Sequence, residues 1–95
     1  MKFEWDEAKA HENERKHSVP FLEATSCFAD ESALVLLDEA HSTGKELRWF
    51  LIGRSDAGRV LTVRYTHRGQ AIRLIGAGAW REGKKLYDKL NRARE

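Results

Sequence analysis

Three arginines on consecutive segments of the chain are the residues with the clearest chemical meaning. Arg54, Arg64 and Arg73 fall in the segments ELRWFLIGR, RVLTVRYT and AIRLIGA, whose apolar residues have the short-period pattern of β-strands. A guanidinium is always charged and engages two phosphate oxygens at once, so it suits the charge that develops on phosphorus when a phosphodiester is cut. The candidate chemistry is therefore phosphate binding or phosphodiester cleavage.

Proton transfer in such chemistry needs further groups, and we expect them to come from His17, His67 and Tyr65. RNA cleaves itself when its 2′-OH attacks the adjacent phosphate, so a protein has only to align the groups, move protons and stabilise charge. The alternative for each histidine is an exposed polar residue without a role. The residues expected to bind RNA are Lys16, Trp80, Arg81, Lys84 and Lys85, with Trp80 as a platform for a base. The alternatives are that Trp80 fills an edge of the core and that the basic residues of the last helix form a solvated face.

The turn HRGQ predicts how two of the arginines are placed. If Arg68 and Gly69 are the central residues of a two-residue hairpin turn, Arg64 lies directly opposite Arg73. Like charges in that position are destabilising, and a fold tolerates them more readily when an anion lies across the pair. The alternative is that both side chains extend into solvent or pair with Glu46 or another acid.

Charge is distributed unevenly along the chain. Residues 1–45 contain five Lys or Arg and ten Asp or Glu, a net −5, whereas residues 46–95 contain twelve and five, a net +7. The basic charge thus belongs to the predicted strands and the last helix. Such segregation is typical of a surface that faces a polyanion, although an acidic protein partner is the alternative.

The composition predicts a single domain spanning residues 1–95, without a metal or cofactor and without a membrane span. Cys27 is the only cysteine, which excludes an internal disulfide and favours the role of a small core residue. His11 and His17 are six residues apart, on opposite sides of a helix, so they do not form a metal site. The N-terminus lacks the apolar core of a signal peptide, which favours a cytoplasmic location.

The order of the predicted elements indicates the α+β class. The pattern predicts a strand over 3–5, a helix over 7–17 with Asp6 as its N-cap, and a second helix from Pro20 to about residue 28. Residues 33–37 form a further strand, 38–45 a polar loop, and 46–78 an antiparallel three-stranded meander. A basic helix runs from about residue 80 to the end of the chain.

Several segments together resemble the BrnT toxins of bacterial type II toxin–antitoxin systems, nearly end to end. The segments are W-D-E-x-K near the start, N-x-x-K-H at 13–17, I-G-R at 52–54 and Y-T-x-R-G at 65–69. The resemblance implies a RelE-like fold, an antiparallel sheet of four to five strands with two N-terminal helices and a C-terminal helix. It also implies a metal-independent ribonuclease that inhibits translation and is neutralised by a ribbon-helix-helix, BrnA-like antitoxin, as a homodimer or a toxin–antitoxin heterotetramer.

The chain departs from the family pattern after the last strand. Where the family commonly has I-S-A-R, this chain has Ile75-Gly76-Ala77-Gly78, so the usual serine and arginine are absent. Two alternatives follow for its activity. The chain is a nuclease that uses Trp80 and Arg81 in their place, or it is a catalytically weak or inactive relative that binds an antitoxin or nucleic acid.

Overall fold

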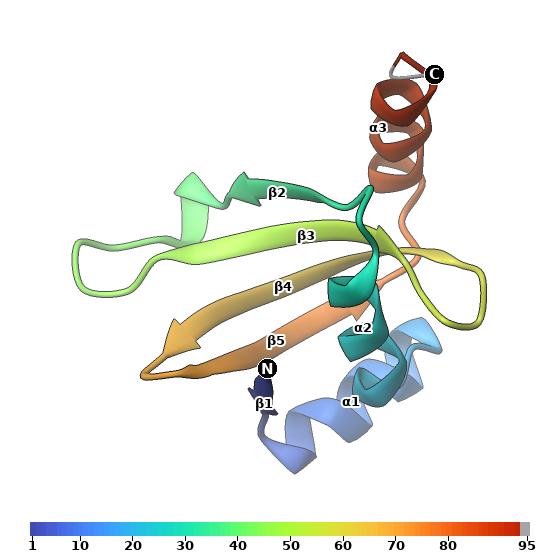
Figure 1. Cartoon of the computed structure of the whole chain (residues 1–95). Helices are drawn as coiled ribbons and strands as arrows, with labels where there is room; N and C mark the ends of the chain where they lie inside the picture. The colour runs from blue at the N-terminus through green and yellow to red at the C-terminus, as the bar shows by residue number, and fades with distance from the viewer. Residues whose placement is uncertain (94–95) are drawn as a thin grey trace.

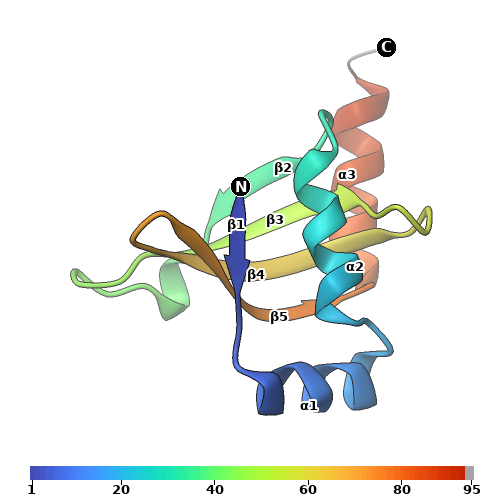
Figure 2. The same ribbon diagram turned by 60° about the horizontal axis from the view of Figure 1, so that its bottom comes forward.

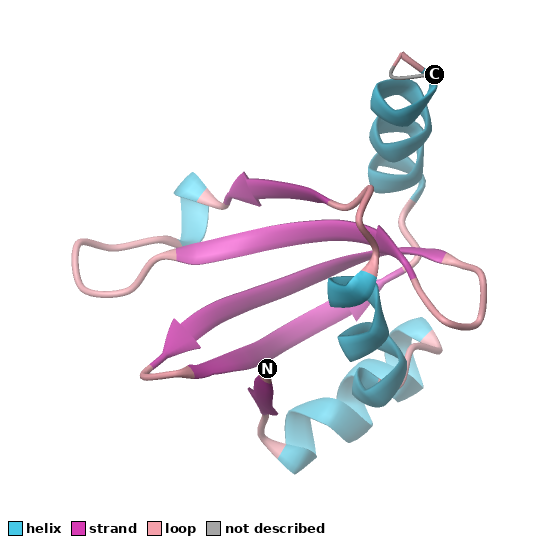
Figure 3. Ribbon diagram, viewed as in Figure 1, coloured by secondary structure: helices cyan, strands magenta, loops and turns pink. Residues whose placement is uncertain are grey.

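The computed structural model describes residues 1–93, which fold into one five-stranded sheet with three α-helices (Figures 1 and 3). In chain order the elements are β1 (Lys2–Glu4), α1 (Glu7–His17), α2 (Phe21–Ser26), β2 (Leu34–Leu37), β3 (Arg48–Arg54), β4 (Val60–Arg68), β5 (Ala71–Gly78) and α3 (Arg81–Arg92). Short 3₁₀ turns follow α2 and β2. The predicted elements are thus confirmed in type and order, apart from the end of the last helix, because residues 94–95 lie outside the described part.

The sheet is mixed, so the prediction of an antiparallel sheet is wrong at one edge. The strand order is β1-β5-β4-β3-β2, and every neighbouring pair is antiparallel except β1 and β5, which are parallel. β1 pairs with β5 through Lys2 opposite Ala71 and Glu4 opposite Arg73. These two strands are separated by most of the chain, so no local turn determines their relative direction.

Helix α1 forms where the sequence predicts it, because both of its ends carry clear signals. The Asp6 side chain accepts hydrogen bonds from the backbone N–H groups of Ala8 (2.8 Å) and Lys9 (3.3 Å), which caps the first turn. At the other end Ser18 adopts the left-handed conformation (φ 57°) and donates its N–H to the Glu14 carbonyl. The helix therefore ends at His17.

The two faces of the sheet are covered by different helices (Figures 1 and 2). α2 packs on one face, where the main core contains Leu61, Val63 and Leu74 from the sheet. Cys27 is fully buried in this core, and burial raises the pKa of its thiol to about 12, which confirms the expected core role. α3 covers one end of the opposite face, where Tyr87 packs with residues of β3 and β4.

The register between β4 and β5 differs from the predicted one. Arg64 lies opposite Gly76, and Arg73 lies opposite Thr66, so the two arginines do not face each other. The turn is centred on Gly69 and Gln70, with Gly69 at φ +62°. A glycine suits either central position of a two-residue hairpin turn, so Gly69 alone does not determine the register. A β-bulge, one extra residue in β5, adds a further shift beyond Tyr65.

Arg64 nevertheless lies on the sheet face that carries α3. In β4 the side chains of Leu61, Val63 and Tyr65 face α2, as the alternation predicts, and Arg64 therefore points to the other side. Its neighbour on β3 is Phe50. The sequence does not determine which side chains of β3 lie on the same sheet face as Arg64. In the structure these are the side chains that share the face of Phe50.

An ion pair joins α2 to the turn between β3 and β4 and predicts an acid-sensitive contribution to stability. Arg59 donates to both carboxylate oxygens of Glu23 (2.6 and 3.0 Å), and this contact lowers the Glu23 pKa below its ordinary value of 4.5. A carboxyl group whose pKa is lowered on folding stabilises the protein above its unfolded-state value, and this stabilisation is lost as the pH falls through the folded value. Arg59 is partly exposed, so we expect the pair to contribute only about 1 kcal/mol.

The substitution Glu23→Gln tests this contribution. At pH 7 we expect the free energy of unfolding to fall by about 1 kcal/mol, and the difference from wild type to shrink below pH 4.5. Urea unfolding at pH 7 and pH 3 measures both values, with Glu31→Gln at an exposed position as the control. A difference that is constant with pH would show that the carboxylate charge is not the cause.

None of the described helices is both long enough and apolar enough to cross a lipid bilayer.

Candidate functional site

A cavity of about 220 Å³ lies between α1 and the β5 side of the sheet, on the face that carries Arg64. Its lining combines cationic, aromatic and small residues: Lys9, Glu12, Asn13, Lys16, His17, Arg64, Ile75, Gly76 and Trp80. Four residues proposed from the sequence, Lys16, His17, Arg64 and Trp80, are therefore brought together here. They come from α1, from β4 and from the residue that precedes α3.

Asn13 attaches α1 to the edge of β5. Its side chain donates to the carbonyl of Ala77 (2.9 Å) and accepts from the N–H of the same residue (3.0 Å), as a neighbouring strand would. It also donates to the Val19 carbonyl (3.0 Å), which fixes the segment after α1. Asn13 is buried, so these contacts position the face of α1 that carries Lys16 against the sheet.

Arg64 lies beside a residue that has no side chain. It is paired in register with Gly76, and a Cβ built on Gly76 would lie 3.9 Å from Arg64 Nη1, an ordinary contact distance. A small side chain such as serine would therefore fit at this position. Among the described residues Arg64 takes part in no ion pair, so its charge is not neutralised by a neighbouring acid.

The cavity has an excess of positive charge. Lys9, Lys16 and Arg64 carry three positive charges and Glu12 one negative charge, which leaves two positive charges with His17 neutral. Glu12 accepts from Arg15 (2.6 Å) and pairs with Lys16 (3.3 Å), and these contacts, with Arg15 the larger cause, lower its pKa to about 2. Glu12 therefore stays ionised and holds the ammonium group of Lys16 near the cavity. An anion such as a phosphate fits these surroundings.

His17 and Trp80 form the end of the cavity. Their rings meet edge to face with centroids 5.3 Å apart, and His17 is exposed, so its imidazole is accessible to a substrate. The indole of Trp80 lies directly on Gly78, since a Cβ built on Gly78 would overlap the ring. A longer residue at position 78, such as the arginine implied by the resemblance, would therefore displace Trp80 from this place.

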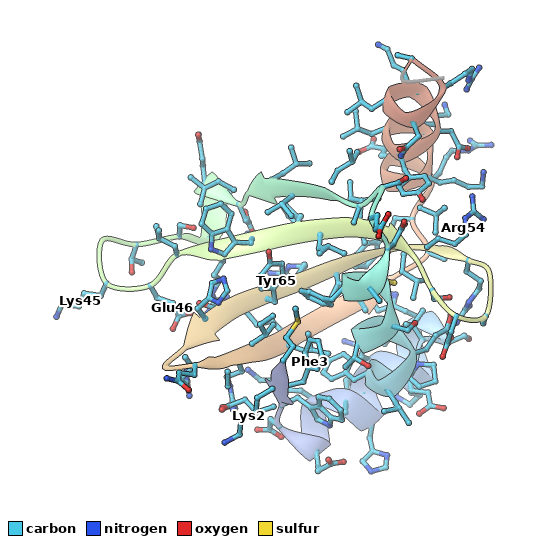
Figure 4. The ribbon with its side chains drawn as sticks, viewed as in Figure 1. Lys2, Phe3, Lys45, Glu46, Arg54 and Tyr65 are labelled. Atoms are coloured by element: carbon cyan, nitrogen blue, oxygen red, sulfur yellow. The ribbon has the colours of Figure 1, made fainter. Side chains whose placement is uncertain are left out.

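Two of the three proposed arginines lie outside the cavity. Arg54 lies at the end of β3 beside α3 (Figure 4), where its guanidinium is 5.7 Å from the ring centroid of Tyr87 and donates to the Gly58 carbonyl (3.1 Å). Arg73 shares the sheet face of Arg64, but its guanidinium is held by Glu4 at 2.8 Å. Of the three, only Arg64 lines the cavity with Lys16 and His17.

The other candidates for proton transfer lie on the opposite face of the sheet. Tyr65 packs into the main core, and burial raises its pKa, so its phenol stays neutral near pH 7 (Figure 4). His67 follows on the same side, with its ring centroid 5.7 Å from that of Tyr65. The candidates of α3, Arg81, Lys84 and Lys85, are exposed on its surface, and Lys84 pairs with Asp88 at 2.7 Å.

Three lining residues of α1 are absent from the sequence-based proposal. Lys9, Glu12 and Asn13 follow helical spacing with Lys16, at i, i+3, i+4 and i+7, so they share one face of the helix. This spacing could have identified them, and Asn13 also begins the N-x-x-K-H segment. The composition of the helix is strongly polar, however, and this alone is typical of a solvated surface. Within residues 1–93 no cluster of three or more His, Cys, Asp or Glu side chains could hold a metal ion.

Comparison with known proteins identifies a family for the chain. No curated protein matches the chain. A family model described as "Ribonuclease toxin, BrnT, of type II toxin-antitoxin system" matches residues 5–83, which include every residue that lines the cavity. The match extends over most of the 95 residues. The chain therefore belongs to the BrnT family of ribonuclease toxins.

Proposed function

We propose that the chain is a toxin that cleaves RNA at the cavity between α1 and the sheet, without a metal ion. The observation that carries the proposal is that Lys16, His17 and Arg64 line one cavity with a positive excess, in a chain of a ribonuclease toxin family. The architecture is consistent with a RelE-like fold, and the site of action is the cytoplasm, where its RNA substrates lie.

The reaction is an attack within the RNA strand. The 2′-oxygen forms a bond to phosphorus and the bond from phosphorus to the 5′-oxygen breaks. A base takes the proton of the 2′-OH, and an acid gives a proton to the departing 5′-oxygen. The products are a 2′,3′-cyclic phosphate and a 5′-OH end, and no metal or second reactant is needed for this step.

Each group in the cavity has a proposed role in this step. Arg64 binds two oxygens of the phosphate and stabilises the charge that develops on them, and Lys16 adds a second cation. His17 moves a proton, because it is the only imidazole that lines the cavity. Trp80 contacts a base of the RNA. Arg81, Lys84 and Lys85 extend the cationic surface beyond the cavity.

The proposed protein partner is a ribbon-helix-helix antitoxin of the BrnA type, in a toxin–antitoxin heterotetramer. Membership of a toxin–antitoxin family supports an antitoxin partner. The edge strand β2 supports a protein partner as well, because Val35, Leu36 and Leu37 are 55, 40 and 41% exposed. Natural monomers usually protect such an edge with charges or proline.

Cleavage of purified RNA tests the proposed activity. Incubation of the protein with total RNA in the presence of EDTA should yield fragments with 2′,3′-cyclic phosphate and 5′-OH ends, detected by end-specific ligation. The change His17→Ala should reduce the rate about 10²- to 10⁴-fold, as expected for loss of a general acid or base. Activity that disappears with EDTA and returns with added Mg²⁺ would contradict the metal-independent mechanism.

A second candidate function is a binding module without catalysis. Gly76 lines the cavity and Gly78 lies against the ring of Trp80. Neither has a side chain where the family commonly has serine and arginine, and this observation favours a weak or inactive relative. Intact RNA after incubation, together with tight binding of RNA or of a co-expressed antitoxin, would support this function over the first.

A further inference from the structure

A second cleft of about 300 Å³ lies next to the cavity on the same sheet face. Its walls are Leu36 of β2, Phe50 and Ile52 of β3, Thr62 of β4, and Trp80. The lining is mainly apolar, and the Leu36 side of the cleft is open, since Leu36 is partly exposed. Clefts of this volume with aromatic walls are typical of small-molecule sites.

Two features connect this cleft to the cavity. Trp80 lines both of them. In addition Phe50, Arg64 and Gly76 lie side by side on three neighbouring strands, where Phe50 lines the cleft and the other two line the cavity. Adjacent strands are about 4.8 Å apart, so a group over Phe50 and a group over Arg64 are separated by about one strand spacing. This is the scale on which a phosphate and its own base are separated.

Charge gives a bound nucleotide one orientation across the two sites. The cavity has two more positive than negative charges, whereas the cleft has the carboxylate of Glu82 at its border and no cation in its lining. A phosphate is therefore attracted to Arg64 and repelled from the cleft. An uncharged, planar, aromatic group has the opposite preference, because it stacks on aromatic rings and fills apolar space.

We propose that this cleft is the subsite for the nucleobase adjoining the phosphate that Arg64 binds, with Trp80 and Phe50 as its aromatic walls. The inference rests on the proposed function and adds the part of the substrate that the cleft recognises. Trp80 is then the residue shared by both halves of the site, since its indole packs against the ring of His17 and also lines the cleft. The base positions the nucleotide, and Arg64 and His17 act on its phosphate.

Binding of small ligands tests the proposal without any need for cleavage. In NMR titrations adenosine 3′-monophosphate should bind at least about tenfold more tightly than ribose 5-phosphate or inorganic phosphate, because stacking adds to the phosphate contact. The backbone amides of Phe50 and Thr62 should shift with the nucleotide and remain in place with inorganic phosphate. Equal affinity of the three ligands, or shifts confined to the cavity, would overturn the proposal.

Substitutions identify which residues are responsible for the tighter binding of the nucleotide. Trp80→Ala and Leu36→Glu should each remove the preference for the nucleotide over inorganic phosphate, and Trp80→Phe should retain most of it. The control is Leu22→Glu on α2, where the leucine is exposed and the helix covers the opposite face of the sheet, and it should leave the preference unchanged. A preference that survives both Trp80→Ala and Leu36→Glu would also overturn the proposal.

The same titrations separate this proposal from the proposed function. If RNA is cleaved but the nucleotide shows no preference, the activity stands and the cleft does not hold the base. If the nucleotide is preferred but RNA stays intact, the subsite stands and the chain is a binding module. If a co-expressed protein partner instead protects the Phe50 and Thr62 amides while nucleotides leave them unchanged, the cleft is a protein-docking surface and the proposal is wrong.

Discussion

Replacing Arg64 with alanine should reduce RNA cleavage by a factor of about 10²–10³, because in the proposed mechanism the guanidinium stabilises the charge that develops on the phosphate. Arg64 is only partly buried, and its side chain makes no ion pair among the described residues. The fold should therefore be little affected, with a change of less than about 1 kcal/mol in the free energy of unfolding. Cleavage rates measured at equal protein concentration, with urea unfolding on the same samples, check both expectations.

Arg54 and Arg73 provide the matched controls for this prediction. Each carries the same charge on a neighbouring strand, but Arg54 lies beside α3 and Arg73 is paired with Glu4. We expect Arg54→Ala and Arg73→Ala to change the cleavage rate by less than about tenfold. Induced expression of the variants in a bacterial host should give the same result, with growth arrest lost only for Arg64→Ala. Growth arrest that persists with Arg64→Ala, or that is lost equally in all three variants, would contradict the role of Arg64.

The largest loss of stability is expected from Asn13→Ala. The change removes three hydrogen bonds and leaves the N–H and carbonyl of Ala77 and the carbonyl of Val19 without this partner. Each unsatisfied buried polar group costs about 1–3 kcal/mol, so we expect a total of about 3 kcal/mol. For a domain of this size the melting temperature should fall by about 15 °C. Chemical and thermal unfolding followed by circular dichroism measure the two effects.

Glu14→Ala is the control, since Glu14 is the next residue of the same helix and its side chain is exposed. It should change stability by less than about 0.5 kcal/mol. Asn13→Asp should also be destabilising, because a carboxylate accepts from Ala77 but cannot donate to the two carbonyls. If Asn13→Ala is as stable as Glu14→Ala, the side chain does not attach α1 to the sheet.

The local part of the fold could be predicted from the sequence because its signals act over a few residues. Asp6 and Ser18 bound α1, and alternation along β4 correctly separates Val63 from Arg64. Contacts between distant segments could not be predicted in this way. The parallel pairing of β1 with β5 depends on residues about 70 positions apart, and no turn signals it.

The candidate site could be predicted only in part for a similar reason. Lys16, His17, Arg64 and Trp80 have suitable chemistry and do line one cavity, whereas Arg54 and Arg73 have the same chemistry and lie elsewhere. Residue type identifies a group that can bind phosphate. Which arginine is left without an ion pair depends on neighbouring acids such as Glu4, which pairs with Arg73. Glu4 lies there because β1 is next to β5 in the sheet.

The bulge in β5 has a consequence for the origin of the cavity. Tyr65 is opposite Leu74, and the residue before it in β4, Arg64, is opposite Gly76. Ile75, between Leu74 and Gly76, therefore has no partner in β4. With equal numbers of residues on both strands, Arg64 would face Ile75, and a branched side chain would occupy the place of the bare glycine. The space beside Arg64, the proposed phosphate site, thus depends on which residue forms the bulge. Deletion of Gly76 would place Ile75 opposite Arg64 and fill this space, without changing Arg64, Lys16 or His17.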